Sequence, residues 1–228
     1  MKKFYPSIRK FAVPLLLLMS LFPTAAKAQY GQIVNQLPQI LSPALSGSGS
    51  YKGFVEATGT FGLGTDKANF LGISTSQGFQ YTSWFFMGAG IGIDAAMAQG
   101  DNSIPQDAYY MPRTATTRAM VPLFTDFRFN IGNGKSASFF IDIKAGAAWI
   151  IGGNGLRIND KVLTTNAKFI LRPSIGVRIP TNSNNLKQAV NIGLTYQLLT
   201  ANNSWYYYGN SRYDTTLSSI GASISYEW

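Results

Sequence analysis

The C-terminal stretch of the chain constrains the fold most, because its side chains alternate strictly between apolar and polar. From Ile220 to Trp228 every even position is apolar, and from Ser219 to Glu227 every odd position is serine, glycine or glutamate. A period of two puts the two sets of side chains on opposite faces of a β-strand. Thr215–Trp228 is therefore predicted to be a strand with one apolar and one polar face.

Seven earlier stretches share this period, so eight strands are predicted. They lie near residues 51–63, 69–80, 84–97, 120–131, 137–151, 166–179 and 188–200. Each is as long as the ~9–11 residues that a tilted strand needs to cross a bilayer, whereas no apolar run reaches the ~18 residues of a spanning helix. Pro173 lies inside the sixth stretch and lacks a backbone donor, so a bulge or weak point is expected there.

The connections between these stretches alternate in length. Those after the second, fourth and sixth stretches are short, whereas residues 98–117, 152–165 and 201–214 form long connections. Short turns at one end and long loops at the other are typical of outer-membrane barrels, with the turns periplasmic and the loops outside. The short first connection, residues 64–67, departs from this pattern. Both ends of the barrel are expected on the periplasmic side.

All the charged residues of the predicted strands fall on the polar face. They are Lys52, Glu56, Asp94, Asp126, Arg128, Asp142, Lys144, Lys168, Arg172, Arg178 and Glu227. Alternation alone fits two arrangements. A soluble barrel with an apolar interior would turn this charged face to water. A membrane barrel would turn it inward, where six cations and five anions would form a nearly neutral network.

The N-terminus favours the membrane barrel, because Met1–Ala28 has the three parts of a secretory signal. A basic segment precedes the apolar run Phe11–Phe22, and Ala26-Lys27-Ala28 is a small-x-small cleavage site. Pro14 and Pro23 argue against the alternative, an uncleaved anchor helix. Export by the Sec pathway is expected. Residues 29–50 are then a periplasmic lead-in, or alternatively a plug that folds into the barrel mouth.

Two features of the strands also favour the inward orientation of the charges. Aromatic residues lie near strand ends on the apolar face, as an interfacial girdle requires. Glycines such as Gly88, Gly90, Gly92 and Gly176 lie on the polar face. The interior of an eight-stranded barrel is just wide enough for side chains to fill, so these glycines would make room for larger residues of other strands.

Composition excludes several classes of function. Only 13% of the residues are charged, against about 25% in soluble domains. There is no histidine, the commonest general base and metal ligand, and no cysteine. The net charge of +9 does not indicate a nucleic-acid partner, because residues 29–228 carry 14 basic and 10 acidic residues, a net charge of +4.

Residues 51–228 resemble the small OmpA/OmpX-type outer-membrane barrels, and most closely the β-barrel-domain proteins of Bacteroides-type bacteria. The resemblance lies in the opening stretch YKGFVEATGTFGLG, the stretch GAGIGID and the closing stretch SSIGASISYEW. It implies that Tyr226 and Trp228 belong to the C-terminal signal read by the barrel-assembly machinery. Many members end in Phe where this chain has Trp228.

Two groups of strand residues suggest chemistry inside the barrel. A hairpin symmetric about Gly134 would put Asp126 opposite Asp142, where the two carboxyls could act as an acid/base pair. With Arg128 and Lys144 nearby, a salt-bridge network is the simpler interpretation. Lys168, Arg172 and Arg178 could line an anion-selective pore, or pair with Glu56, Asp94 and Glu227.

Two of the long connections could bind ligands. Residues 201–214 combine aromatic and polar side chains that could bind a sugar or a protein, or simply extend the interfacial girdle. The candidates are Trp205, Tyr206, Tyr207, Tyr208, Arg212 and Tyr213. Residues 98–117 contain Asp101, Asn102 and Asp107, but their spacing matches no known calcium loop.

The sequence thus predicts an all-β chain, an eight-stranded antiparallel up-and-down transmembrane β-barrel in the outer membrane of a Gram-negative cell. Residues 1–28 are the signal peptide, 29–50 the linker and 51–228 the barrel domain. A non-enzymatic protein without cofactor or metal is expected, with a structural or surface-interaction role through residues 98–117, 152–165 and 201–214. Its predicted partners are outer-membrane lipid and the assembly machinery. The alternative is a narrow pore for small solutes.

Overall fold

A computed structural model describes residues 50–99, 116–132, 137–153, 155–158, 161–181, 188–206 and 209–228. The predicted signal peptide and nearly all of the predicted linker or plug, residues 29–50, lie outside these residues. From Tyr51 onward the described residues belong to one compact unit, Tyr51–Trp228. No helix in the described part of the chain is long and apolar enough to cross a membrane.

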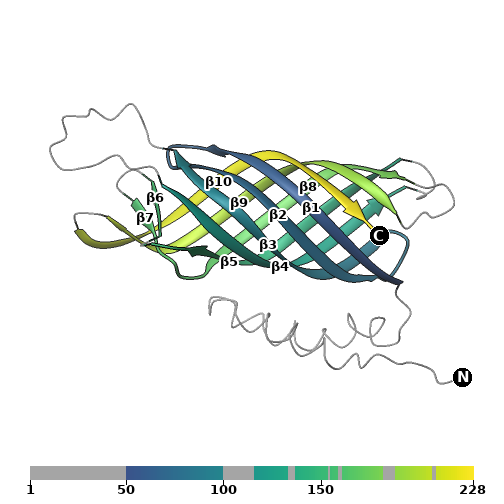
Figure 1. The fold of residues 1–228 in the computed structure, drawn as a ribbon, viewed down its shortest axis with the longest axis horizontal. Helices are drawn as coiled ribbons and strands as arrows, with labels where there is room; N and C mark the ends of the chain where they lie inside the picture. Colours follow the sequence, from purple (N-terminus) through teal and green to yellow (C-terminus); the bar gives the residue numbers. More distant parts are fainter. Residues whose placement is uncertain are drawn as a thin grey trace, which may run out of the picture. The chain divides into compact units, whose positions relative to one another are not determined.

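Eight long strands in the described residues close into an antiparallel barrel (Figure 1). They are β1 (Ser50–Leu63), β2 (Lys67–Gln80), β3 (Phe85–Gln99), β4 (Thr117–Ile131), β5 (Ser138–Ile151), β8 (Lys168–Pro180), β9 (Ala189–Tyr206) and β10 (Gly209–Glu227). Each pairs with the next along the chain, and β10 pairs with β1. The predicted eight-stranded antiparallel barrel is confirmed.

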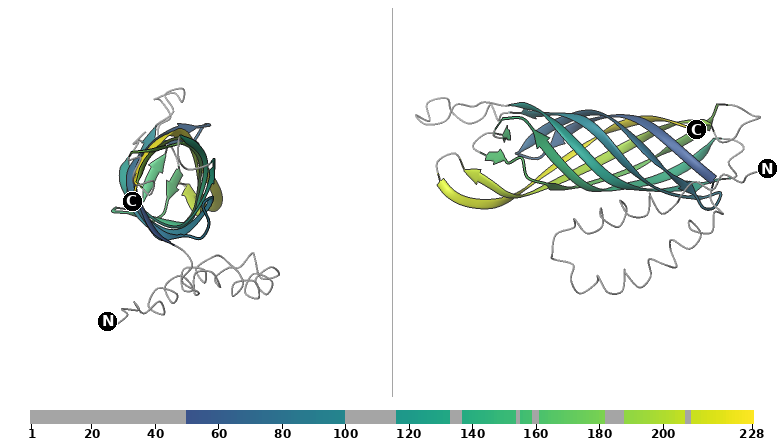
Figure 2. Two further views of the ribbon diagram at one scale, coloured as in Figure 1. Left: turned by 90° about the vertical axis from the view of Figure 1, so that its right-hand side faces the viewer. Right: turned by 60° about the horizontal axis from the view of Figure 1, so that its bottom comes forward.

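The first and last strands join from Phe54↔Glu227 to Leu63↔Ser218. Beyond this ladder, Gly53 and Trp228 exchange two backbone hydrogen bonds of 3.1 Å. Closure leaves no open sheet edge to face hydrocarbon, which could not satisfy it. We call the end that holds Tyr51 and Trp228 the turn end, and the opposite end, where β1 and β9 finish, the loop end (Figure 2).

The two faces of the barrel differ as predicted. Large apolar side chains cover the outside, among them Leu71, Ile93 and Leu194, each at least 60% exposed. All eleven charged residues predicted to share the polar face point inward and are at most 5% exposed. The arrangement with the charged face outward, which a soluble barrel would require, is therefore wrong.

The last two strands are longer than predicted, which corrects the interpretation of residues 201–214 as a loop. β9 continues to Tyr206 and β10 begins at Gly209, so the hairpin extends past the end of β1 at Leu63. Its register shifts between Gly209 and Arg212 and again between Tyr213 and Thr215. Most of the predicted loop is an extension of the sheet beyond the closed part of the barrel.

The predicted loop 152–165 also contains regular structure. Two short strands, β6 (Leu156–Ile158) and β7 (Lys161–Leu163), form a hairpin at the loop end (Figure 1). β7 pairs with the extended part of β9 through Lys161↔Tyr206 and Val162↔Trp205. Three-residue strands are too short to show a period in the sequence.

Pro173 produces a gap in a ladder rather than a bulge. Pairing of β8 with β9 lapses after Leu171↔Leu198 and resumes in the same register at Ser174↔Thr195. Pairing with β5 continues through Ile143↔Pro173 without a shift. The missing N–H of proline accounts for the gap, because that backbone position has no donor for the ladder.

Candidate functional site: the filled lumen

The lumen is the candidate site, because every predicted strand charge lies in it. Its two halves differ in chemistry. Charged and hydroxyl side chains fill the half nearer the turn end, and apolar side chains fill the half nearer the loop end.

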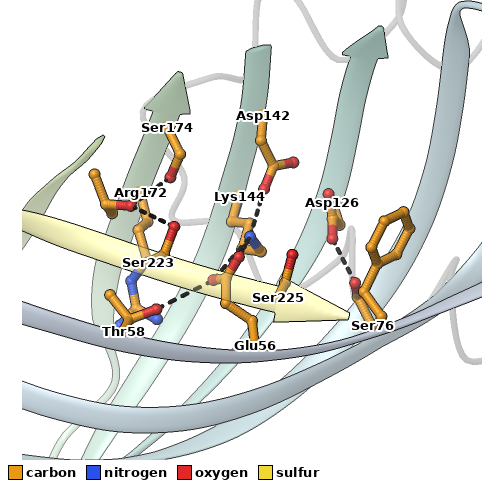
Figure 3. Close-up of polar contacts among 12 residues, drawn as sticks. Glu56, Thr58, Ser76, Asp126, Asp142, Lys144, Arg172, Ser174, Ser223 and Ser225 are labelled. Atoms are coloured by element: carbon orange, nitrogen blue, oxygen red, sulfur yellow. Dashed lines mark hydrogen bonds and ion pairs between the residues drawn. The ribbon is translucent and has the colours of Figure 1, made fainter. Parts of the chain in front are cut away.

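A four-residue charge cluster of Glu56, Arg128, Asp142 and Lys144 crosses the middle of the barrel, and Figure 3 shows three of its members, Glu56, Asp142 and Lys144. Lys144 Nζ on β5 lies 3.0 Å from a carboxylate oxygen of Glu56 on β1 and 2.5 Å from Asp142 Oδ2. Arg128 Nη2 on β4 lies 3.1 Å from the same Asp142 oxygen. The Lys144–Glu56 pair joins strands that are not neighbours, so the cluster ties opposite walls of the barrel together.

Asp126 does not lie directly opposite Asp142 as predicted, although the two carboxyls are within side-chain hydrogen-bonding distance of each other. In the structure Asp126 lies opposite Lys144, and Arg128 lies opposite Asp142. The hairpin is centred one residue later than predicted, so each acid on one strand faces a base on the other. Like charges directly opposite one another destabilise a sheet, whereas this register pairs opposite charges. Asp126 Oδ2 accepts a 2.5 Å hydrogen bond from Ser76.

Phenylalanines that the sequence interpretation missed surround the Arg128 guanidinium. Its central carbon lies 4.2 Å from the ring centre of Phe54 and 4.6 Å from that of Phe140. A cation over aromatic faces is stabilised by the ring quadrupoles, the more so when water is excluded. Phe54 could have been found from the sequence, because it lies between Lys52 and Glu56 in the inward register.

Inward glycines make room for these rings, as predicted. A Cβ built on Gly90 would lie 2.4 Å from the Phe124 ring, and one on Gly176 would lie 2.8 Å from the Phe140 ring. Neither position could take a larger residue unless the ring moved. Bulky residues of one strand thus occupy space that glycines leave on others.

A second charge cluster lies at the turn end and is organised by Glu227. Lys52 Nζ is 2.9 Å from Glu227 Oε1, and Arg178 Nη2 is 2.5 Å from the same oxygen. Asn191 Nδ2 donates to the other carboxylate oxygen at 3.4 Å. The penultimate residue of the chain therefore connects β10 to β1 and β8 through buried charges.

The three cations of β8 do not line an open channel. Arg172 Nη2 lies 2.5 Å from Asp94 Oδ2 across the barrel, and its Nε donates to Gln197 at 2.9 Å. Arg178 binds Glu227. Lys168 differs from both, because its Nζ donates to the backbone oxygens of Thr164 and Asn166.

The boundary between the two halves of the lumen is tightly packed. A narrow gap lined by Phe124, Lys144, Ile170 and Arg172 is too small to hold a water molecule. Above it, toward the loop end, lies a cluster of buried apolar side chains that the sequence interpretation missed. The cluster comprises Ala68, Phe70, Ala96, Met120, Ala148, Ile150, Leu156, Ile158, Leu163, Ile170, Leu199 and Leu217.

The predicted binding residues at the loop end are only partly described. Trp205 and Tyr206 belong to β9, and Arg212 and Tyr213 to β10, with Arg212 paired to Trp205. Tyr207, Tyr208 and the possible calcium ligands of residues 100–115 lie outside the described residues. Within the described ranges, no group of three or more acidic side chains could hold a metal ion.

The predicted assembly-signal residues lie on the outer surface at the turn end. The rings of Tyr226 and Trp228 are stacked with centres 6.3 Å apart, and each side chain is 38% exposed. Trp228 lies over Gly53, where an added Cβ would be 2.5 Å from its ring. The absence of a side chain at Gly53 therefore allows the last residue to pack on β1.

Comparison with protein-family models and with curated proteins finds no match. Among solved structures, the crystal structure of Neisserial surface protein A aligns with a TM-score of 0.51 and 9% identity, over 78% of this chain and 95% of that one. The chain has the fold of a small outer-membrane β-barrel. A more distant match is the outer membrane enzyme PagL, with a TM-score of 0.43 and 16% identity over 76% of this chain and 97% of that one. Another is the outer membrane protein AlkL, with a TM-score of 0.47 and 12% identity over 79% of this chain and 90% of that one.

The pairing of Arg172 with Asp94 is testable by a double-mutant cycle. Arg172→Leu should destabilise the barrel by about 3–5 kcal/mol, because it leaves a buried carboxylate without its cation. Asp94→Leu combined with Arg172→Leu should recover much of this loss. The measurement is the free energy of unfolding by urea in lipid vesicles. Additive losses in the double variant would contradict the pairing.

Proposed function

We propose that the protein is a non-enzymatic outer-membrane barrel with a closed lumen, and that its role is structural or surface-interactive through the connections at the loop end. The observation that carries the proposal is the filling of the lumen. Ion pairs occupy one half, apolar side chains occupy the other, and the gap between them is too small for water. A closed barrel leaves its lipid face and its two ends as the surfaces for function.

The engagement of the lumenal carboxylates supports a non-enzymatic role. Four of the five on the described strands, those of Glu56, Asp94, Asp142 and Glu227, are each within ion-pair distance of a cation. The fifth, Asp126, is fully buried and accepts a hydrogen bond from Ser76. The chain has no histidine to act as a base. The fold itself does not decide the matter, since one fold hosts many functions.

Export and orientation are part of the same proposal. The signal-like residues 1–28 would direct the chain through the Sec pathway, and the barrel would insert with its turn end in the periplasm. Tyr51 and Trp228 share that end, so both termini of the barrel domain would be periplasmic. The extended β9–β10 hairpin and the connections 98–117 and 152–165 would then face outside.

The closed lumen predicts no steady ion conductance when the purified protein is inserted into planar bilayers. A general porin measured in the same membranes serves as the positive control. A reproducible single-channel conductance would instead favour the alternative, a narrow pore. If such a conductance also changed with Arg172→Ala, the current would pass the inner face of β8.

The proposed orientation predicts the accessibility of inserted epitopes on cells. A tag placed within residues 103–112, between β3 and β4, should be labelled by antibody on intact cells. A matched tag within residues 133–136, between β4 and β5, should be labelled only after the outer membrane is permeabilised. The opposite result would reverse the orientation of the barrel.

A further inference from the structure

The apolar half of the lumen is filled by the barrel wall and by the β6–β7 hairpin together. Three of its barrel residues, Ala68, Ala96 and Ala148, are alanines on different strands, and each is at most 1% exposed. Methyl groups reach only a short way toward the barrel axis. Side chains of the β6–β7 hairpin complete the filling, since Leu156, Ile158 and Leu163 are fully buried in the same cluster. The barrel wall thus forms an apolar chamber, and the hairpin occupies it.

Only a few backbone contacts attach the hairpin to the wall. Its two strands pair over three residues each, and a two-stranded hairpin is at best marginally stable alone. In the described residues, its links to the barrel include two residue pairs with β9 and the contacts of Arg157 with Thr116. Burial of Leu156, Ile158 and Leu163 adds to this attachment.

A glycine-rich segment joins the hairpin to β5. Gly152, Gly153 and Gly155 have φ angles of +91°, +57° and +103°. Glycine adopts this left-handed region without steric cost, unlike other residues. A short segment that tolerates large changes in backbone angle is what a hinge requires. Such a segment would let the hairpin move while β5 stays in the sheet.

Two cations at the mouth of the chamber bind backbone oxygens on either side of the hairpin. Arg118 Nε on β4 donates to Gly155 O at 3.2 Å, just before β6. Lys168 Nζ on β8 donates to the oxygens of Thr164 and Asn166, just after β7. Among the described side chains, neither cation has a carboxylate in ion-pair range. Both would be stabilised more by an anion than by a neutral carbonyl.

We propose that the β6–β7 hairpin is a displaceable plug over a binding chamber for a single-chain anionic amphiphile, such as a medium-chain fatty acid. The hairpin offers the barrel what this ligand would offer: oxygen acceptors for Arg118 and Lys168, and apolar groups for the chamber. With the hairpin displaced, the ligand carboxylate binds the two cations and its chain takes the place of Leu156, Ile158 and Leu163.

The floor of the chamber limits the length of the ligand. The chamber ends at Phe124 and the Arg172–Asp94 pair, which seal it from the turn end. Along β8, the four residue steps from Lys168 to Arg172 span roughly 13 Å at about 3.3 Å per residue. The chamber therefore holds a chain but does not pass it through the barrel. This inference needs only the arrangement of the loop end and goes beyond the proposed structural role.

Photo-crosslinking in lipid nanodiscs tests the proposal. A medium-chain fatty acid that carries a diazirine at its tail is added to the whole mature protein, and modified residues are mapped by mass spectrometry. Crosslinks are expected on the inward residues Phe70, Met120, Ile150 and Leu199, which do not face lipid. Crosslinks confined to outward residues such as Leu71 and Ile93 would overturn the proposal.

A disulfide that locks the hairpin provides the decisive variant. Val162→Cys with Trp205→Cys joins Cα partners of β7 and β9, which in antiparallel sheets are close enough for a disulfide. The chain has no other cysteine. Oxidation should abolish the inward crosslinks and reduction should restore them. Inward crosslinks that persist in the oxidised protein would overturn the role of the hairpin.

Matched controls separate the plug from general effects of a crosslink. Ala57→Cys with Ile224→Cys joins Cα partners on the β1–β10 seam, and its oxidation should leave the inward crosslinks unchanged. If the first lock fails to assemble, Lys161→Cys with Tyr206→Cys provides the second register pair. A diazirine alcohol of equal length tests the cations: equal inward labelling by acid and alcohol would overturn the role of Arg118 and Lys168.

Discussion

The pairing of buried charges across the lumen is the constraint on which the rest of the structure depends. An unpaired charge is costly to remove from water, and hydrocarbon offers it no partner. The barrel therefore turns these residues inward, where nine of the eleven, all on described strands, form ion pairs. The matches join distant strands: Glu56 on β1 with Lys144 on β5, and Asp94 on β3 with Arg172 on β8. Each such pair fixes the relative height of two walls, because a slip of one residue would turn a charge into lipid.

The loop end fills its interior by a different means. There the inward residues are apolar, and the β6–β7 hairpin completes a dry core with its own side chains. The ion pairs of the charged half fix the register of the strands. The apolar half only requires side chains of suitable shape and volume to fill it. The two halves therefore differ in how readily their contents can be exchanged. Removing one partner of an ion pair exposes a buried charge, while one apolar group can replace another of similar size.

The period of two was enough to predict the eight strands and to place all their charged side chains on one face. The signal-like N-terminus, the aromatic residues and the glycines were needed to assign that face to the lumen. The period did not predict which charges meet, because the pairs across the lumen and the β4–β5 register depend on contacts between segments distant in sequence. Asp126 was placed opposite Asp142 for this reason, although Lys144 lies there. The apolar half was missed because the two faces of each strand were told apart by polarity. Inward apolar residues such as Met120 and Ile150 have apolar outward neighbours, so the sequence shows no alternation there. Residues 152–165 and 201–214 were predicted to be loops. Their strands are stabilised by pairing with one another beyond the closed barrel, which the sequence pattern does not show.

The orientation of the side chains can be measured directly along β9 by site-directed spin labelling in lipid vesicles. Because the chain has no cysteine, single cysteines at successive positions from Val190 to Leu198 can each carry a label. Collision with lipid-soluble oxygen should be frequent at the even positions and rare at the odd ones, which lie in the filled lumen. The opposite phase, or collision without a period of two, would contradict an apolar exterior around an ion-paired interior.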